Sequence, residues 1–568
     1  TMFSSIKTLK ENEKLFYLTA KGSGKKAPLQ AIKLLAEQGL KIKTIVITAK
    51  KKICNACSNS CSPDDCPFAK QFFDKLREAT LDIFENNDIF DEEAILNTAN
   101  KYQICAFEFS LYLSYFCDIV IADYNYVFDP NVHLKRFFSE GKKGKYLFLI
   151  DEAHNLVERG REMYSAVLYK EQFLSVKKKM KEYPKLTRQL DACNKILLEM
   201  KRECETYQLH TSISALYIKL VNVLNNMEKI MEEKKQTDDE VLEFYFAVRF
   251  FLNVYEELDE SYTIYTEMEE DGRFKIKLFC INPAANLDKY LTYGNSTIFF
   301  SATLLPITYY KKLLSVESDD YAVYAESPFD EKNRLVTLGY DVSTRYTKRS
   351  ESMYQKYARY IQCIINAKKG NYLVFFPSYK FMEDVQNVFA KLQAKNTVCV
   401  MQEQNMNEEK REVFLKQFEV EREENLVGFC VLGGVFSEGI DLKEERLIGA
   451  IIVGTGLPQV CNEREILKQY FEKQGENAFD YAYLYPGMNK VLQAAGRVIR
   501  TEQDIGIVAS LDPVAIDRAS LDLIYKSQDP GREHFLERVE TRHGAHTIEH
   551  AVTLGLGTTF YEIINLDN

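Results

Sequence analysis

The sequence predicts an α/β protein with two α/β units built on parallel sheets, the first of them interrupted by two insertions. Strand and helix patterns alternate over residues 12–50 and return from residue 315 onward. Between these regions, residues 161–271 contain no Gly and a single Pro, and their apolar residues recur at helical spacing. Because 568 residues exceed what one core holds, several domains are expected.

The individual elements follow from apolar runs bounded by turn residues. Residues 147–150 form an uninterrupted apolar run, which is typical of a strand buried in a parallel sheet. Helices are expected at residues 28–38 and within 69–85. The other expected strands are 14–19, 44–48, 119–126, 372–376, 428–432, 450–453 and 505–510.

Composition excludes several classes of protein. The net charge of −10 argues against a uniformly basic surface, although it leaves room for a local basic groove. No run of about 18 apolar residues occurs, so no membrane span is expected, and the beginning of the sequence lacks a signal-peptide pattern. Thirteen cysteines, many inside apolar segments, fit a cytoplasmic protein with mostly reduced thiols.

An acidic tetrapeptide, Asp151-Glu-Ala-His154, follows the buried strand at 147–150. Ligands gather at the carboxyl ends of parallel strands. An Asp at that position can hold Mg²⁺, and the Glu after it can orient or deprotonate a water that attacks a phosphate. The alternative is a strand that ends in a solvated acidic turn.

Two further strand ends carry small or polar residues. Residues 295–303 end in Ser301-Ala-Thr303, whose hydroxyls could link a nucleotide site to a second ligand. The segment from Gly433 to Asp441 follows a strand and is rich in Gly, so its backbone can approach a ligand closely. An ordinary strand-to-loop turn and a tight turn are the respective alternatives.

The segment from Gln493 to Arg500 predicts a helix that presents two cations. Arg497 and Arg500 are three residues apart and would share one helix face. Two guanidinium groups suit the charge that builds on a transferring phosphoryl group. A surface pair of salt-bridged arginines is the alternative.

Five cysteines between residues 54 and 105 are candidates for a metal site. A set of four thiolates could hold zinc or a [4Fe–4S] cluster, and spacing alone does not choose between them. Unliganded buried cysteines are the alternative. The five are Cys54, Cys57, Cys61, Cys66 and Cys105.

Taken together and in this order, these motifs resemble superfamily 2 helicases, in particular the DEAH-type iron–sulfur branch that includes bacterial damage-inducible and XPD-like DNA repair helicases. The resemblance covers roughly residues 1–504. It implies two RecA-like motor domains, ATP and Mg²⁺ as cofactors, and a [4Fe–4S] cluster. It also implies a monomer that moves 5′→3′ on single-stranded DNA and opens duplex DNA.

The resemblance implies a role for each site residue. Asp151 would hold Mg²⁺, Glu152 would activate the water, and His154 would couple the nucleotide to Ser301 and Thr303. In the second domain, Gly439 and Asp441 would sense nucleotide together with Gln493, and Arg497 and Arg500 would act as arginine fingers. The cluster ligands would be Cys54, Cys61, Cys66 and Cys105, with Cys57 as a spare.

The resemblance also divides the chain. It places the first motor domain at 1–50, 115–159 and 286–314, an iron–sulfur insertion at 51–114, and an all-helical arch insertion at 160–285. The second motor domain would span 315–510. Residues 511–568 form an atypical tail that resembles the end of an uncharacterised ferredoxin-associated family; its histidines, at 543, 546 and 550, fit surface positions better than a metal site.

The phosphate-binding loop expected of such an ATPase is not evident. Lys21-Gly-Ser-Gly-Lys-Lys26 lies between a strand and a helix, but Thr19 and Lys26 stand where a Gly and a hydroxyl residue are needed. The segment 16–21 instead resembles a motif that contacts the nucleic-acid backbone. Residues 1–9 resemble the helix after the phosphate loop, so Thr1 would be the last loop residue. The chain is therefore expected to be truncated at its N-terminus within this loop, to lack most of the loop, to bind ATP poorly and to hydrolyse little.

Contacts to nucleic acid are expected mainly through phosphates. Lys21, Lys25, Lys26 and the lysines at 50–52 are candidates, and Tyr124, Tyr126 and Tyr346 could stack on bases. Two other functions stay open. One is a catalytically silent fragment that binds nucleic acid, and the other is a zinc or redox protein that uses the cysteines.

Overall fold

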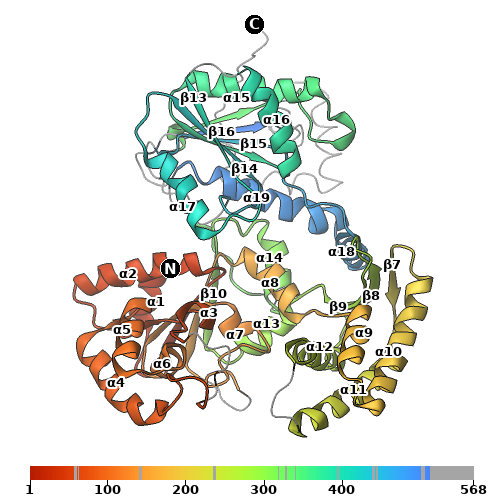
Figure 1. Ribbon diagram of the computed structural model, residues 1–568. Coiled ribbons are helices and arrows are strands. Elements are labelled where there is room, and N and C mark those ends of the chain that lie inside the picture. Colours follow the sequence, from red (N-terminus) through yellow and green to blue (C-terminus); the bar gives the residue numbers. More distant parts are fainter. Residues whose placement is uncertain are drawn as a thin grey trace. The chain divides into compact units, whose positions relative to one another are not determined.

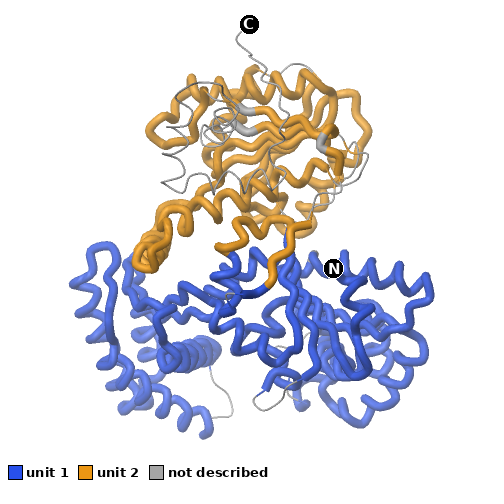
Figure 2. Tube along the Cα trace, turned by 180° about the vertical axis from the view of Figure 1, so that it is seen from behind, with its two compact units in different colours: residues 1–301, 310–320 blue, residues 302–309, 321–568 orange. Residues whose placement is uncertain are grey.

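The computed structural model describes two compact units (Figure 2). The first comprises residues 1–301 and 310–320, and the second comprises residues 302–309 and 321 onward. The residues described are 1–56, 61, 63–139, 144–233, 238–317, 319–325, 329–339, 341–392, 396–437, 442, 446–499, 504 and 506–511.

The first unit is built on a six-stranded parallel sheet in the order β10-β5-β1-β4-β2-β3. Its helices α1 to α7 are labelled in Figure 1. The central strand β1 is buried on both faces. Leu15 and Tyr17 face a core formed with helices α1 and α2, whereas Phe16 packs on Phe138 and Phe148 from the other side. The strands are β1 (Lys14–Thr19), β2 (Thr44–Val46), β3 (Ile89–Phe90), β4 (Ile119–Asp123), β5 (Tyr146–Asp151) and β10 (Ser296–Phe300).

Helices connect these strands. A 3-10 turn, η1 (Gly22–Lys25), leads into α2. The helices are α1 (Met2–Thr8), α2 (Lys26–Glu37), α3 (Lys50–Ile53), α4 (Phe72–Asn86), α5 (Glu92–Tyr102), α6 (Ala106–Leu113), α7 (Asn125–Phe128), α8 (His154–Tyr164), α13 (Ala284–Leu291) and α14 (Ile307–Leu314).

The insertion between α8 and α13 has a core of its own, centred on Phe173, Leu197, Leu220 and Phe244. Its helices are α9 (Lys170–Lys179), α10 (Pro184–Glu203), α11 (Ser214–Glu233) and α12 (Asp239–Glu256). Its strands are β6 (Ala166–Tyr169), β7 (Tyr207–His210), β8 (Tyr262–Met268) and β9 (Phe274–Cys280), paired as an antiparallel sheet in the order β6-β9-β8-β7.

This sheet corrects the expectation that the insertion at 160–285 is all-helical. In β9, Phe274, Ile276 and Leu278 are fully buried, and the two lysines between them are not. That alternation has the period of a strand rather than of a helix. Gly272, with a φ of 83°, closes the hairpin to β8. The helical spacing of the four long helices masked these short strands in the sequence.

The second unit is built on another six-stranded parallel sheet, in the order β11-β16-β15-β12-β14-β13. Its strands are β11 (Arg334–Leu338), β12 (Asn371–Phe376), β13 (Thr397–Met401), β14 (Asn425–Val431), β15 (Gly449–Val453) and β16 (Gly506–Leu511). Its helices are α15 (Glu351–Ala367), α16 (Tyr379–Leu392), α17 (Glu408–Lys416), α18 (Asn462–Lys473) and α19 (Tyr485–Ala495), with a π-helical turn at Asp480–Leu484 before α19.

Helices cover both faces of this sheet. Tyr372 and Val374 of β12 pack with α15 and α16, and Leu373 and Phe375 pack on the other side with residues of α17 and α19. Each strand expected from the sequence has a counterpart, and the α/β class with two parallel sheets is confirmed.

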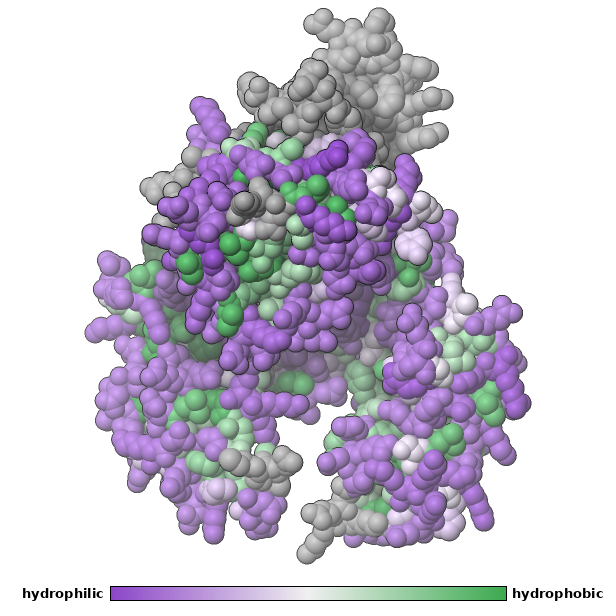
Figure 3. All heavy atoms as spheres, turned by 45° about the horizontal axis from the view of Figure 1, so that its top comes forward, coloured by the Kyte–Doolittle hydropathy of each residue, from purple (hydrophilic) through white to green (hydrophobic). Residues whose placement is uncertain are grey.

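Hydrophilic residues cover most of the face shown in Figure 3. Within the described ranges, no helix combines the length and the apolar character that a membrane crossing needs.

Candidate functional site

The acidic tetrapeptide stands where strand β5 ends at the edge of the first sheet. Leu149 and Ile150 are fully buried, and β5 pairs with β10 so that Asp151 lies opposite Phe300. The carboxyl end of β10 therefore brings Ser301 beside the tetrapeptide, although 149 residues separate Ser301 from Glu152. The sequence predicted this edge as the ligand-binding edge.

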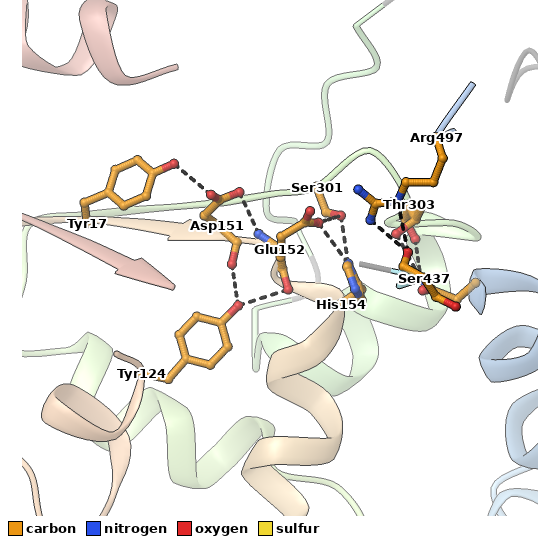
Figure 4. Close-up of polar contacts among 10 residues, drawn as sticks. Tyr17, Tyr124, Asp151, Glu152, His154, Ser301, Thr303, Ser437 and Arg497 are labelled. Atoms are coloured by element: carbon orange, nitrogen blue, oxygen red, sulfur yellow. Dashed lines mark hydrogen bonds and ion pairs between the residues drawn. The ribbon is translucent and has the colours of Figure 1, made fainter. Parts of the chain in front are cut away.

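Asp151 presents a carboxylate that is hydrogen-bonded at both oxygens (Figure 4). The Tyr17 hydroxyl donates to Oδ2 at 2.8 Å, and the backbone N–H of Glu152 donates to Oδ1 at 2.8 Å. Burial raises the pKa of Asp151, and the hydrogen bond from Tyr17 opposes that shift. A fixed carboxylate of this kind suits a hard cation such as Mg²⁺.

Glu152 has an unusual backbone. Its φ angle is 49°, in the left-handed region that non-glycine residues rarely adopt. The Tyr124 hydroxyl donates to the carbonyl oxygens of Asp151 and Glu152, the latter at 3.0 Å. The Glu152 side chain is 53% exposed, so its carboxylate is accessible to water.

Ser301 and His154 hold the Glu152 carboxylate. The Ser301 hydroxyl donates to Glu152 Oε2 at 2.8 Å, and His154 Nδ1 lies 2.8 Å from Ser301 Oγ and 3.4 Å from Glu152 Oε2. A hydroxyl has one proton, and it is used toward Glu152. His154 must therefore carry a proton on Nδ1 to donate to Ser301. His154 was expected to couple to Ser301 and Thr303, and its contact with Ser301 is present.

In the second unit, Thr303 is tied to helix α19. Asn489 Nδ2 donates to the Thr303 carbonyl at 2.9 Å and to its Oγ1 at 3.2 Å, and both residues are buried. Gln493, one turn further along α19, is also buried. Asn489 was not expected from the sequence, because a lone Asn in a helix gives no local signal of a distant partner.

Arg497 lies outside helix α19, which ends at Ala495. The expectation that Arg497 and Arg500 share a helix face is therefore wrong at Arg497. Its Nε and Nη2 both donate to the Ser437 carbonyl, at 3.0 and 2.8 Å, and the side chain is buried. Arg500, Gly439 and Asp441 lie outside the described residues, as do Cys57 and the tail from residue 512.

Thr1 precedes α1 at its N-cap position, where its carbonyl oxygen accepts hydrogen bonds from the backbone and side chain of Ser5. Three lysines follow β1, of which Lys21 and Lys26 are exposed. Lys25 is partly buried, its Nζ donates to the Ile47 carbonyl at 2.5 Å, and burial lowers its pKa.

Two of the aromatic residues expected to stack on bases are buried. Tyr124 is fully buried and Tyr126 is 7% exposed, so that prediction is wrong for both. Sequence alternation placed them near a strand end but did not show which way they face. Tyr346, in contrast, is 84% exposed, and the Arg349 guanidinium lies 5.5 Å from its ring centre.

Four cysteines of the first insertion lie among the described residues, and these four, Cys54, Cys61, Cys66 and Cys105, are free thiols. Lys50 connects two of them, since a hydrogen bond with Cys61 is the main cause that raises its pKa, and Cys105 adds to it. Burial raises the pKa of Cys105, and Cys54 contributes to that shift. Cys66 is buried.

These four thiols have the donor chemistry of a [4Fe–4S] site. Their geometry fits less well. In the part of the chain that the structure describes, no three His, Cys, Asp or Glu side chains are grouped closely enough to hold a metal ion.

Comparison with known proteins agrees with this architecture. The chain matches the DEAD_2 family over residues 6–173 and the helicase C-terminal domain family over residues 361–530. The two matches give this chain a DEAD_2 domain and a helicase C-terminal domain.

Three curated relatives show the extent of the similarity. The ATP-dependent DNA helicase XPD of Sulfolobus acidocaldarius is 26% identical over 415 residues, which cover 71% of this chain and 70% of that protein. A probable ATP-dependent helicase of Methanocaldococcus jannaschii is 25% identical, over 50% of this chain and 42% of that protein. The ATP-dependent DNA helicase DinG of Photobacterium profundum is 27% identical, over 44% and 36%. This chain therefore spans less than half of the length of two of these relatives.

Solved structures share the fold of this chain. The S. tokodaii Xpd4 structure aligns with a TM-score of 0.55 at 14% identity, covering 91% of this chain and 90% of that one. A structure titled XPD helicase aligns with a TM-score of 0.51 at 19% identity, covering 90% and 94%.

Proposed function

We propose that this protein is an ATP-dependent DNA helicase that couples ATP hydrolysis to 5′→3′ movement on single-stranded DNA and to duplex opening. The observation that carries the proposal is the hydrogen-bonded set of Asp151, Glu152, His154 and Ser301 at the carboxyl edge of a parallel sheet. The two family matches and the names of the curated relatives support the same activity.

The first unit would supply the hydrolytic chemistry. Asp151 would hold Mg²⁺, which when bound neutralises charge on the nucleotide phosphates. Glu152 would accept the proton of the attacking water, because its carboxylate is accessible and is held by Ser301. His154, through the Ser301 hydroxyl, would keep that carboxylate oriented as the proton is transferred.

The second unit would supply residues that respond to the nucleotide. We propose Arg497 and Arg500 as arginine fingers. The proposed nucleotide sensors are Gly439, Asp441 and Gln493. Ser301 and Thr303 would couple ATP hydrolysis to movement on DNA, and Thr1 would take part in nucleotide binding. For Arg497 this role requires an exchange of partners, from the Ser437 carbonyl to a phosphate oxygen. The match over residues 361–530 supports this assignment.

The decisive experiment measures Mg²⁺-dependent ATP hydrolysis at saturating ATP, because weak ATP binding is expected of this chain, with and without single-stranded DNA, in the wild type and in Glu152→Gln. The proposal expects stimulation by DNA in the wild type and a loss of about 100-fold or more in the variant, because the general base is removed while its size is kept. Salt-sensitive DNA binding with no hydrolysis in either protein would instead identify a silent nucleic-acid-binding fragment.

We further propose that Cys54, Cys61, Cys66 and Cys105 hold a [4Fe–4S] cluster. The thiolate donor chemistry of this set and the free state of all four thiols support it. Protein purified without oxygen should be brown and contain iron and sulfide in equal amounts. Zinc without sulfide would favour the redox or zinc alternative.

We also propose that the protein is a monomer in the cytoplasm and acts on single-stranded and duplex DNA in repair. The cysteines that the structure describes form no disulfides, which fits a reducing compartment such as the cytoplasm. Light scattering coupled to size-exclusion chromatography tests the monomer, whose mass is 65.8 kDa.

A further inference from the structure

Two buried tyrosines direct their hydroxyls at the Asp151–Glu152 pair from neighbouring strands (Figure 4). Tyr17 belongs to β1, which pairs with β5, and Tyr124 directly follows β4, which pairs with β1. Neither was assigned a role at this pair from the sequence. Their rings fill the core, as those of phenylalanine would, so their hydroxyls need a separate explanation.

Tyr17 acts on the side chain of Asp151. Its ring is 6% exposed, and its hydroxyl donates to Oδ2 at 2.8 Å. A phenolic hydroxyl carries its proton at neutral pH, so it remains a donor to this oxygen. The second carboxylate oxygen is held by the Glu152 N–H. The two bonds together fix the rotation of the carboxylate.

Tyr124 acts on the backbone rather than on a side chain. It is fully buried, and its hydroxyl donates to two successive carbonyl oxygens, those of Asp151 and Glu152. Between these carbonyls lies the left-handed conformation of Glu152. For a residue other than glycine this conformation costs about 1–3 kcal/mol and persists only where surrounding contacts impose it.

The left-handed turn determines where the Glu152 carboxylate goes. It ends the strand at Asp151, lets Ala153 N–H donate to the Phe300 carbonyl, and leaves the Glu152 side chain against Ser301. A relaxed backbone at this residue would rotate the side chain away from that hydroxyl. The hydrogen bonds that Tyr124 makes to the backbone therefore decide where the Glu152 carboxylate lies.

We propose that Tyr17 and Tyr124 are positioning residues, in which Tyr17 orients the Asp151 carboxylate for the metal ion and Tyr124 holds the left-handed backbone that aims Glu152 at Ser301. This inference rests on the proposed ATP hydrolysis, since it assigns how that site is kept in order. It predicts two separable effects, one on metal binding and one on turnover.

The test compares Tyr17→Phe and Tyr124→Phe with Tyr126→Phe as a matched control. Tyr126 is a buried tyrosine two residues from Tyr124, and within the described residues its hydroxyl makes no hydrogen bond to Asp151 or Glu152. Each variant removes one hydroxyl and keeps the ring. ATP hydrolysis is measured over a range of Mg²⁺ concentrations, giving kcat and the Mg²⁺ concentration at half-maximal rate.

Tyr17→Phe should raise the half-maximal Mg²⁺ concentration about tenfold and change kcat less than about threefold, because groups that orient a metal ligand typically contribute 10–100-fold. Tyr124→Phe should lower kcat about tenfold or more and leave the Mg²⁺ dependence within about threefold. Tyr126→Phe should match the wild type in both. If all three variants behave alike, the two hydroxyls serve packing only and the inference is overturned.

A second measurement needs neither nucleotide nor metal. Hydrogen–deuterium exchange of the amides at 152–156 should be about tenfold faster in Tyr124→Phe and unchanged in Tyr17→Phe and Tyr126→Phe. If the wild type does not hydrolyse ATP, the proposed function fails, and exchange alone then decides: faster exchange in Tyr124→Phe retains its positioning role, and exchange equal to the wild type overturns it. If Tyr124→Phe fails to fold, the double variant with Glu152→Gly should fold, since glycine keeps the left-handed conformation unaided; failure of both is evidence against the inference.

Discussion

The left-handed backbone at Glu152 leads to a prediction with an unusual sign. A left-handed conformation costs a residue with a Cβ about 1–2 kcal/mol, whereas glycine adopts it freely. Glycine loses roughly 0.4–1 kcal/mol in exchange, through the greater freedom of its unfolded chain. With a φ of 49° at this position, we expect Glu152→Gly to be more stable than Glu152→Ala by about 1 kcal/mol.

The comparison of the two variants isolates the backbone, because both remove the same carboxylate and the same hydrogen bond from Ser301. Thermal unfolding followed by circular dichroism measures the difference. For a cooperative unit of 150–250 residues, about 1 kcal/mol corresponds to a shift of roughly 2–4 °C in Tm. Glu152→Asn should fall between the two, since Asn tolerates the left-handed region better than Ala.

Glu158 provides the control, since it lies inside helix α8, where the backbone is right-handed. Glu158→Gly should be less stable than Glu158→Ala by about 1 kcal/mol. The order of stability of the Gly and Ala variants is thus opposite at these two positions, which are six residues apart. A Glu152→Ala variant that is as stable as Glu152→Gly would refute the claim that this backbone is strained.

Three further predictions concern stability. Burial raises the pKa of Asp480 from its ordinary value of 3.8 to about 6, so its stabilising contribution is present below pH 4 and is lost as the pH rises to 6. Asp480→Asn should therefore leave Tm unchanged at pH 4. Above pH 6 it should raise the free energy of unfolding by about 1–2 kcal/mol, since solvent partly screens the carboxylate. Gly160→Ala would place a Cβ 2.7 Å from Pro283 Cβ, and it should lower the free energy of unfolding by about 1–3 kcal/mol in urea titration. Asn489→Ala would leave the buried Thr303 carbonyl without this donor, so it should cost about 1–3 kcal/mol, and a Tm equal to that of the wild type would contradict the contact.

Much of the fold could be predicted because its signals are local. The buried run of β5 and the acidic residues after it adjoin in sequence, and the rule that ligands gather at the carboxyl ends of parallel strands then places Asp151 and Glu152 correctly. The grouping of Ser301 with them follows from the same rule applied to β10. These predictions needed only the direction of each strand.

The contacts that the sequence did not predict depend on the register of paired strands and on the direction in which each side chain points. Tyr17 meets Asp151 because β1 and β5 pair with Tyr17 opposite Leu149, across 134 residues of chain. No local pattern states that register. In the same way, Tyr126 was expected at the surface, but a short helix after β4 turns its ring into the core. Arg497 was placed on a helix that ends two residues before it.

The insertion between α8 and α13 begins with β6 and ends with β9, and these two strands pair antiparallel with Ala166 opposite Leu278. Paired strands lie about 4.8 Å apart, so the chain enters and leaves the insertion at adjacent points. The insertion also has a hydrophobic core of its own, so it is a separate subdomain. The length and shape of the insertion can therefore change without moving Asp151 and Glu152, because its core is separate from the sheet that holds them.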